Sequence, residues 1–218
     1  MKKKFKISII DYKISNLKSV SNALNFLEIN NEITHDPKKI LTSDAAILPG
    51  VGSFLEGMKN LNDLSLIDPI KEFIFNNKPF LGICLGMQLL FDKSHEFCVT
   101  PGLGIFKGEV KNFRMINKSC KIPHLGWNQA KTNPSVSMNK LILNPFKNIT
   151  NDQNLFYFVH SFVVLPNNSE DILTETNYEN IKFCSSILRK NVFASQFHPE
   201  KSGNVGLKVM KNFFSNFQ

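Results

Sequence analysis

Short apolar runs and helical apolar repeats alternate along the first ninety residues. The runs predict strands at four places: residues 4–11, 31–36, 43–54 (which breaks into a Pro-Gly-Val-Gly loop) and 79–84. Apolar residues spaced three and four apart predict helices at three places: residues 15–27, from 54 onward, and 67–76. Strands that alternate with helices favour a parallel sheet that is covered by helices on both faces.

The pattern changes after residue 104, where strand-like runs follow one another between turns such as Asn144-Pro145. These runs cover residues 104–115, 122–132, 155–165, 182–189 and 192–197, and a last helix covers 207–214. The sequence therefore predicts an α/β fold with a mostly parallel central sheet, helices on both faces and additional antiparallel β elements. Since no internal repeat or linker interrupts the chain, we expect one domain over residues 1–218.

The composition fits a soluble globular protein, with 42% hydrophobic and 20% charged residues among 218. No apolar run reaches the roughly 18 residues that a membrane span needs. The N-terminal run ISII is too short for the apolar core of a signal peptide. We therefore expect a cytoplasmic protein that does not associate with membranes.

The four cysteines show no spacing typical of a metal or redox site, because none belongs to a Cys-x-x-Cys pair. In a chain of this size without a secretion signal, reduced thiols are favoured over a disulfide framework. We expect no metal and no cofactor. Three of the cysteines are expected to be small buried hydrophobic residues: Cys98, Cys120 and Cys184.

The net charge of +8 raises the question of nucleic-acid binding. The basic residues are 24 Lys and only two Arg, Arg114 and Arg189, and they are scattered along the chain. Specific contacts with bases and phosphates favour the planar fork of Arg. The charge therefore indicates a solvated Lys-rich surface, and it remains compatible with an anionic substrate or an acidic partner.

Cys84 lies between two glycines, Gly82 and Gly86, where an apolar run changes into a helical pattern. A sharp strand-to-helix turn that displays a nucleophile needs such glycines, because its backbone approaches neighbouring backbone closely. A helix that begins after Cys84 would direct unpaired N–H groups at the sulfur and favour the thiolate. The Leu85 N–H could then donate to an oxyanion. A cysteine that is simply buried between glycines explains the same pattern.

A cysteine nucleophile needs a base, and the base needs a group that orients it. Among the five histidines, His198 has a carboxylate two residues away, that of Glu200. Pro199 fixes the backbone between them, so the two side chains could act as a unit. A histidine that merely caps the end of a strand is the alternative interpretation.

The loop Pro49-Gly50-Val51-Gly52 follows a predicted strand. Ligands bind at the carboxyl ends of the strands in open parallel sheets. The N–H groups of this loop could therefore supply a second oxyanion donor. A plain turn without function would have the same composition.

Five segments, in their order and spacing, resemble the class I (triad) glutamine amidotransferases: PGVGSF, PFLGICLGMQLLF, PHLGWN, FYFVHSF and QFHPEKS. GICLGMQ with a later HPE is specific to that superfamily. PHLGWN with FVHSF is more similar to the HisH-type glutaminase subunit of imidazole glycerol phosphate synthase, as is the opening DYKISNLKSV. The resemblance spans residues 11–202 and implies a flavodoxin-like sheet.

The resemblance implies hydrolysis of the glutamine side-chain amide to glutamate and ammonia. It makes Cys84 the nucleophile, His198 the general base and acid, and Glu200 the group that orients His198. The backbone N–H groups of Val51 and Leu85 would hold the oxyanion. The positions that surround glutamine in the family correspond to Gly50, Gly52, Gln88, Glu96, Ser161 and Phe162. On sequence alone, a solvated carboxylate at a helix end explains Glu96 equally well.

The resemblance also implies a heterodimer with a (β/α)₈-barrel cyclase subunit of the HisF type. Ammonia passes through the barrel in that family, and the products are imidazole glycerol phosphate and an aminoimidazole carboxamide ribotide of histidine biosynthesis. The family's interface positions correspond to Asn16, Trp127, Tyr157 and Lys201. Core packing is the competing explanation for the two aromatic residues. The lone subunit is expected to be a weak glutaminase, because the partner organises the oxyanion loop.

The opening motif departs from the family, which usually has glycines where this chain has Lys13 and Ser15. That loop faces the partner in the family, so the identity of the partner stays open. The alternative is a related glutaminase that feeds ammonia to a nucleotide-sugar or surface-polysaccharide amidotransferase.

Two other classes of protein fit the sequence less well. An α/β-hydrolase orders its triad as nucleophile, acid and histidine, whereas Glu200 follows His198 here. A non-catalytic interaction protein with a decayed site would be free to lose Cys84, His198 or Glu200, and all three are present.

Overall fold

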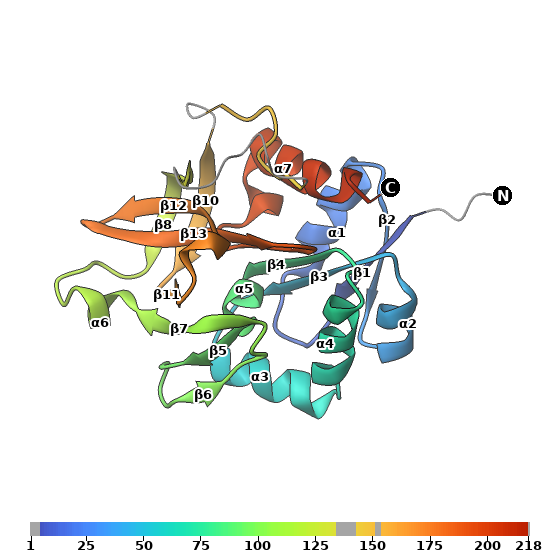
Figure 1. The fold of residues 1–218 in the computed structure, drawn as a ribbon, viewed down its shortest axis with the longest axis horizontal. Coiled ribbons are helices and arrows are strands. Elements are labelled where there is room, and N and C mark those ends of the chain that lie inside the picture. The colour runs from blue at the N-terminus through green and yellow to red at the C-terminus, as the bar shows by residue number, and fades with distance from the viewer. Residues whose placement is uncertain (1–4, 134–142, 151–153, 218) are drawn as a thin grey trace.

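The computed structural model describes residues 5–133, 143–150 and 154–217. Its centre is an eight-stranded sheet in the order β2-β1-β3-β4-β14-β13-β12-β9 (Figure 1). The strands from β2 to β14 are parallel, and β13, β12 and β9 continue the sheet in antiparallel pairs. These strands are β1 Lys6–Ile10, β2 Asn30–Thr34, β3 Ala45–Gly50, β4 Phe80–Cys84, β9 Lys131–Thr132, β12 Ile172–Tyr178, β13 Ile181–Arg189 and β14 Val192–Ser195.

Helices follow most of the parallel strands. They are α1 Leu17–Phe26, α2 Pro37–Thr42, α3 Phe54–Asp63, α4 Ile67–Phe75, α5 Leu85–Leu89, α6 Phe113–Ile116 and α7 Gly203–Ser215, with the 3₁₀ turns η2 Ser169–Asp171 and η3 Pro199–Lys201. Side-chain oxygens of Asn16, Asp36 and Ser53 accept hydrogen bonds from first-turn N–H groups and so begin α1, α2 and α3. None of the helices in the described ranges is both long and apolar enough to cross a lipid bilayer.

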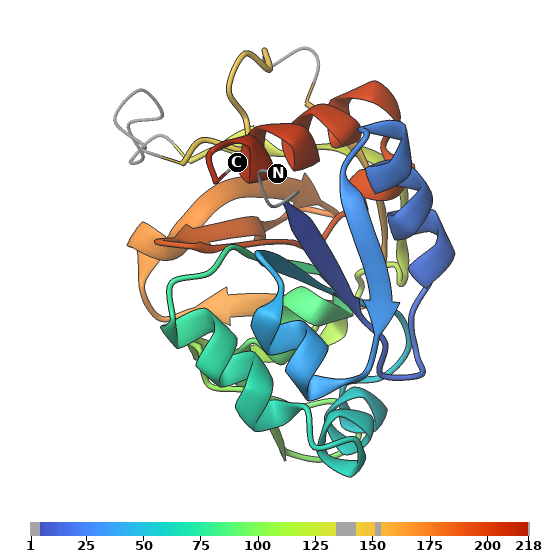
Figure 2. The same cartoon turned by 90° about the vertical axis from the view of Figure 1, so that its right-hand side faces the viewer.

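The two faces of the central sheet bury separate cores, because successive side chains of a strand point to opposite faces. Ile7 and Ile9 of β1 pack with apolar residues of α1 and α7. Ile10 packs instead with apolar residues of α2, α3, α4 and α5. Figures 1 and 2 show these two layers of helices with the strands between them.

Two smaller sheets extend the two cores. One pairs β8 (His124–Gln129) with β10 (Leu155–His160), and Phe156 and Phe158 join the core beneath α1 and α7. The other has the order β11-β7-β5-β6 and belongs to the opposite core. Its strands are β5 Phe91–Ser94, β6 Thr100–Pro101, β7 Phe106–Asn112 and β11 Phe162–Pro166. Ser161 joins β10 to β11, so the chain passes from one small sheet to the other at this residue.

The predicted α/β architecture is confirmed, and several details differ from the prediction. The run at 192–197 was expected among the antiparallel elements, but β14 lies parallel to β4 and only its pairing with β13 is antiparallel. The expected strands at 122–132 and 155–165 are each two strands, because the chain changes sheet at Ala130 and again at Ser161. The strands β5, β6 and β12 and the short helices α2 and α6 were not predicted, and the six residues of α2 give too few turns for a clear repeat.

All four cysteines are free thiols, as expected. Cys120 and Cys184 are buried, which confirms their prediction. The prediction for Cys98 is wrong. This residue is exposed, because it lies in the connection between β5 and β6, where its neighbours Phe97 and Val99 are exposed as well.

Candidate active site

The sheet brings the ends of three parallel strands together. Cys84 is the last residue of β4 and pairs with Gly50, the last residue of β3. On its other side β4 pairs with β14, which ends at Ser195 just before His198. Since carboxyl ends of parallel strands meet at one edge of a sheet, the thiol, the glycine loop and the histidine lie at the same edge.

The turn at Cys84 is a strained connection between β4 and α5. Its φ of 54° and ψ of −108° lie outside the regions that most residues occupy. Gly86, at the start of α5, lies directly against β3, because a Cβ atom there would be 1.8 Å from the carbonyl oxygen of Leu48. The glycine therefore allows the close approach that the Gly-x-Cys-x-Gly pattern predicts for this turn.

His198 and Glu200 form a buried pair on the 3₁₀ turn η3. Nδ1 of His198 lies 2.8 Å from Oε1 of Glu200, and both side chains are only 2% exposed. Burial alone lowers the pKa of His198, but the adjacent Cys84 sulfur and the Glu200 carboxylate outweigh it and raise that pKa above its usual value. The arrangement therefore favours a protonated His198 ring beside the Cys84 sulfur.

The backbone of β10 supports this pair. The N–H of His198 donates to the carbonyl oxygen of Tyr157 at 2.9 Å. The Ser202 hydroxyl accepts from the Tyr157 N–H and donates to the His198 carbonyl oxygen. The position of His198 is therefore tied to β10 by main-chain groups.

A pocket of about 200 Å³ opens beside Cys84. Eight residues predicted from sequence line it: Val51, Gly52, Cys84, Leu85, Gln88, Glu96, Ser161 and Phe162. Val159 and His160, which were not predicted, complete the lining. Gly50 pairs with Cys84 outside this lining, and His198 is buried next to the thiol with Glu200 behind its ring. Within the described part of the chain, no cluster of His, Cys, Asp or Glu side chains could hold a metal ion.

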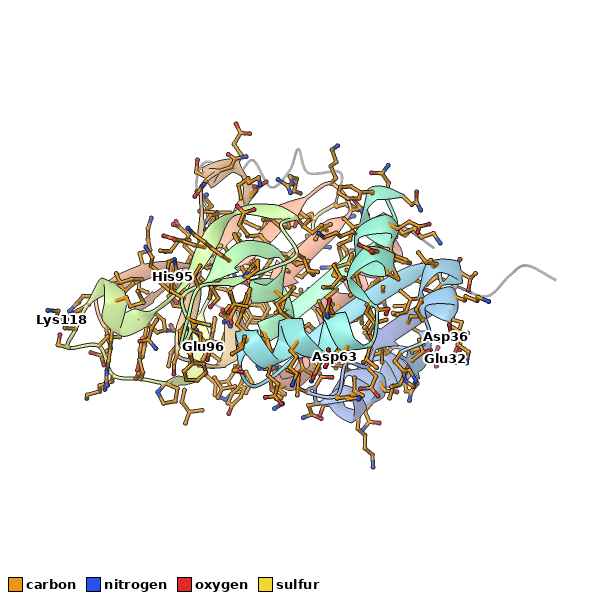
Figure 3. The ribbon with its side chains drawn as sticks, turned by 90° about the horizontal axis from the view of Figure 1, so that it is seen from below. Glu32, Asp36, Asp63, His95, Glu96 and Lys118 are labelled. Atoms are coloured by element: carbon orange, nitrogen blue, oxygen red, sulfur yellow. The ribbon has the colours of Figure 1, made fainter. Side chains whose placement is uncertain are left out.

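Glu96 is not the solvated carboxylate that the sequence also allowed. Its Oε2 accepts a hydrogen bond of 2.6 Å from the N–H of Phe54, the first residue of α3. Figure 3 shows Glu96 near that end of α3. Partial burial raises the pKa of Glu96, and the bond from Phe54 opposes this change. A carboxylate in this position can attract a cationic group in the pocket.

The two predicted oxyanion donors differ in their surroundings. Leu85 begins α5 directly after Cys84, where first-turn N–H groups have no partner within the helix. The Val51 N–H instead donates to the carbonyl oxygen of Ile14 at 3.1 Å. In this structure the Val51 N–H is therefore engaged by the opening loop and is not free to bind an oxyanion.

Three residues near the thiol were missed although each lies within a motif quoted above. Gln196 is completely buried, and its Nε2 lies 3.5 Å from the Cys84 sulfur. The hydroxyl of Tyr12 is buried without a hydrogen-bond partner, and burial followed by the charge of Cys84 raises its pKa. The third is His160. Gln196 could have been found from sequence, because it follows the strand that precedes His198.

A chain of hydrogen bonds links His160 to His124 beneath the pocket. Nδ1 of His160 donates to the Phe162 carbonyl at 2.9 Å, because a carbonyl oxygen can only accept. Nε2 of His160 is then the acceptor for Nδ1 of His124, also at 2.9 Å. Burial lowers the pKa of His124 to about 4. Burial also lowers the pKa of His160, and repulsion from a charged His124 lowers it further, to about 3. Both rings are therefore neutral at pH 7.

We expect the free energy of unfolding to fall as the pH is lowered from 7 to 5. Unfolded His124 and His160 bind protons below about pH 6.5, whereas the folded rings stay neutral until about pH 4 and 3. The unfolded state thus gains protons first, and stability falls by up to about 1.4 kcal/mol per pH unit for each ring. The raised pKa of His198 changes stability only above about pH 6.5, where the unfolded histidine loses its proton before the folded one does.

Urea unfolding at pH 7 and pH 5 tests this expectation. A His124→Asn, His160→Asn double variant should show a flatter dependence on pH, whatever its absolute stability. Equal unfolding free energies for the unsubstituted protein at both pH values would contradict neutral buried rings.

Three of the four predicted partner-contact residues lie together. Trp127 on β8 pairs with Tyr157 on β10, with ring centres 6.2 Å apart, and the Lys201 ammonium lies 6.0 Å from the Tyr157 ring. Trp127 is 57% exposed, so core packing does not explain it. Asn16 is exposed at the start of α1 and is not part of this aromatic pair.

The sequence and the fold can be compared with those of known proteins. The family model for class I glutamine amidotransferases matches residues 8–217. The imidazole glycerol phosphate synthase subunit HisH 1 of Methanococcus maripaludis is 45% identical, over 95% of this chain and 98% of its own length. Subunit HisH of Geobacter metallireducens is 40% identical, over 95% and 96% of the two chains. A chain of PurLQS from Thermotoga maritima shares the fold, with a TM-score of 0.72 at 18% identity over 99% and 100% of the two chains.

Proposed function

The chain belongs to the class I glutamine amidotransferases, and from this premise we propose that it is the glutaminase subunit of an imidazole glycerol phosphate synthase. The observation that carries the proposal is the pocket beside Cys84, which the His198–Glu200 pair adjoins at the same edge of the sheet. Relatives with that name, 40% and 45% identical over 95% of this chain, support the choice of synthase. We also propose that residues 1–218 work as one glutaminase domain.

In the proposed reaction the Cys84 thiolate attacks the amide carbon of glutamine and forms a glutamyl thioester. His198 gives its proton to the nitrogen, which leaves as ammonia. It then takes a proton from water, and that water attacks the thioester carbon and releases glutamate and the thiolate. Glu200 orients the ring through its 2.8 Å hydrogen bond and stabilises the imidazolium.

Two backbone donors are proposed to stabilise the oxyanion of each tetrahedral intermediate, the N–H groups of Leu85 and Val51. The Leu85 N–H lies at the start of α5, next to the sulfur. The Val51 N–H has to leave the Ile14 carbonyl oxygen before it can donate into the pocket. A partner that breaks the hydrogen bond between Val51 and Ile14 would free the Val51 N–H for the oxyanion and would in this way raise the activity of the subunit.

The remaining pocket residues are proposed to hold the substrate by its amino-acid end. The half-buried Glu96 carboxylate lines the pocket and can carry a negative charge. It is therefore proposed to bind the positively charged α-ammonium group of glutamine. Gln88, Ser161 and Phe162 offer amide and backbone groups on the other side, and the Gly50–Gly52 loop provides room for the reacting amide. Glutamate, the product, would present a carboxylate to this loop in the place where glutamine presents its amide.

The partner is proposed to be a (β/α)₈-barrel cyclase subunit of the HisF type that receives the ammonia. The exposed face of β8 and β10 suits this contact, because Trp127 and Leu125 are exposed apolar side chains on neighbouring positions of β8. Tyr157 and Lys201 extend the same face, and Asn16 lies at the start of α1. Aromatic residues of this kind commonly dominate the affinity of such interfaces.

A second candidate is a related glutaminase that feeds a nucleotide-sugar or surface-polysaccharide amidotransferase. The opening loop favours it, because Lys13 holds a φ of 74° where the family usually has glycine. A side chain at a position of this kind changes the surface that the loop presents to a partner. The chemistry at Cys84 would be the same for both candidates.

Reconstitution with a barrel cyclase subunit tests the proposed function. Alone, the chain should release glutamate slowly from glutamine. With the barrel subunit and its ribulosyl substrate, the rate should rise by about 10² or more, the effect of one oxyanion donor, and one imidazole glycerol phosphate should form per glutamate. Glutamate without imidazole glycerol phosphate would favour the second candidate. No glutamate under either condition would contradict a glutaminase.

A further inference from the structure

Gln196 lies between the end of β14 and His198, and its side chain is fully buried. Its backbone N–H donates to the Ser185 carbonyl oxygen at 2.9 Å, which fixes the direction of the side chain. The side-chain Nε2 lies 3.5 Å from the Cys84 sulfur, within range of an N–H···S hydrogen bond. The Oε1 atom lies 3.0 Å from Nε2 of Gln88.

The direction of these bonds follows from the group at the far end of the chain. The Phe162 carbonyl oxygen can only accept, and it lies 3.2 Å from Nε2 of Gln88. Gln88 must therefore direct its NH₂ group to this side, and its second hydrogen points to Oε1 of Gln196. Gln196 is left with its own NH₂ group facing the sulfur. The orientation of both amides is thus set by a backbone atom.

A donor aimed at a buried sulfur stabilises the charged thiolate more than the neutral thiol. Gln196 is fully buried, so water does not compete for its N–H. The nearby His198 stabilises the thiolate through the positive charge of its protonated ring. Gln196 stabilises it through a neutral N–H. Loss of His198 and loss of Gln196 should therefore weaken the thiolate through separate contacts.

We propose that Gln196 is a further catalytic residue, whose amide N–H stabilises the Cys84 thiolate and holds the sulfur toward the pocket. The inference rests on the proposed glutaminase function, because it assigns the thiolate as the nucleophile. Gln88 has a second part in this arrangement, since its amide keeps that of Gln196 in the donating orientation. The chain Phe162–Gln88–Gln196–Cys84 also links the pocket wall to the nucleophile.

The test measures the rate at which iodoacetamide alkylates Cys84 as a function of pH. A Cys98→Ala background removes the exposed thiol, and mass spectrometry of the peptide identifies the modified residue. Gln196→Glu keeps an acceptor for Gln88 and replaces the donor by an oxygen. We expect alkylation at pH 7 to slow by about tenfold or more, the worth of a hydrogen bond to a charged group. The pH of half-maximal alkylation should rise.

Gln196→Met is the second variant, which removes the donor without adding a charge and should slow alkylation in the same direction. Both variants should lower kcat with the barrel subunit present by a similar factor and change KM for glutamine little. Gln129→Glu, on the partly buried end of β8, is the matched control for the alkylation measurement, which involves no partner, and should alkylate like the background protein.

A purely structural role predicts a different result, a lower midpoint of thermal unfolding with an unchanged pH profile of alkylation. That outcome, or a kcat equal to that of the background protein in both variants, overturns the inference. The proposed function fails separately, if the unsubstituted chain releases no glutamate. Alkylation still reports on Gln196 in that case, because it requires neither glutamine nor a partner.

Discussion

Replacement of Cys84 by alanine should abolish glutamine hydrolysis, with kcat at least about 10⁴-fold below that of the unsubstituted protein. In the proposed mechanism the Cys84 sulfur attacks the amide, and no other thiol lines the pocket. His198 and Glu200 keep their 2.8 Å hydrogen bond without it, but they have no nucleophile to serve. The measurement is glutamate release in the presence of the barrel subunit.

The fold should survive this substitution, because alanine fills most of the volume of a buried cysteine. Circular dichroism and thermal unfolding of the variant check this point. Cys98→Ala is the control for the general effect of losing a thiol, since Cys98 is exposed and lies outside the pocket lining. Glutamate release by Cys84→Ala at the rate of this control would refute the proposed nucleophile.

Gly86→Ala should destabilise the protein by about 3 kcal/mol, at the upper end of the usual penalty for overpacking. A Cβ atom at this position would lie 1.8 Å from the carbonyl oxygen of Leu48 and 2.8 Å from its carbonyl carbon. Both are backbone atoms of β3, so the clash cannot be relieved by a side-chain rotation. Either α5 moves away from β3, or β3 leaves its pairing with β4.

Either displacement also moves Cys84 relative to the glycine loop, because Gly50 and Cys84 are paired neighbours. We therefore expect a lower denaturation midpoint together with a loss of glutaminase activity. Gly57→Ala in α3 is the matched control, since its Cβ would meet only side-chain methyl groups of Leu89 and Leu85 at 3.2 Å or more. A wild-type midpoint for Gly86→Ala would show that β3 and α5 are not held as closely as described.

Much of the fold was predictable because its first half consists of regular, strongly patterned elements. The apolar residues of β1, β3 and β4 and the caps at Asn16 and Ser53 are local features, which a sequence displays directly. The parallel pairing of β14 with β4 was not predictable from its own residues. A strand carries no mark of its neighbour's direction, and this pairing depends on the turn before β14 and on the core around it.

The candidate site likewise contains residues that could be predicted from sequence and contacts that could not. Cys84, His198 and Glu200 could be proposed from sequence, because each is a specific residue type in a distinctive local setting. The bond from Val51 to Ile14 and that from Phe54 to Glu96 could not, since each joins segments that only the fold brings together. The exposure of Cys98 was missed for a related reason, because the course of a loop is set by the strands that it connects.

The main-chain hydrogen bond between His198 and β10 has a consequence for how glutamine amidotransferase subunits diverge in evolution. Tyr157 turns its ring toward the exposed aromatic face, while its main-chain carbonyl oxygen holds the His198 amide. Every amino acid has that carbonyl group, so the side chain at 157 and those facing it on β8 can be exchanged without loss of the bond. Descendants of one ancestral gene can therefore acquire a new recipient for their ammonia by surface substitution and inherit the hydrolytic centre intact.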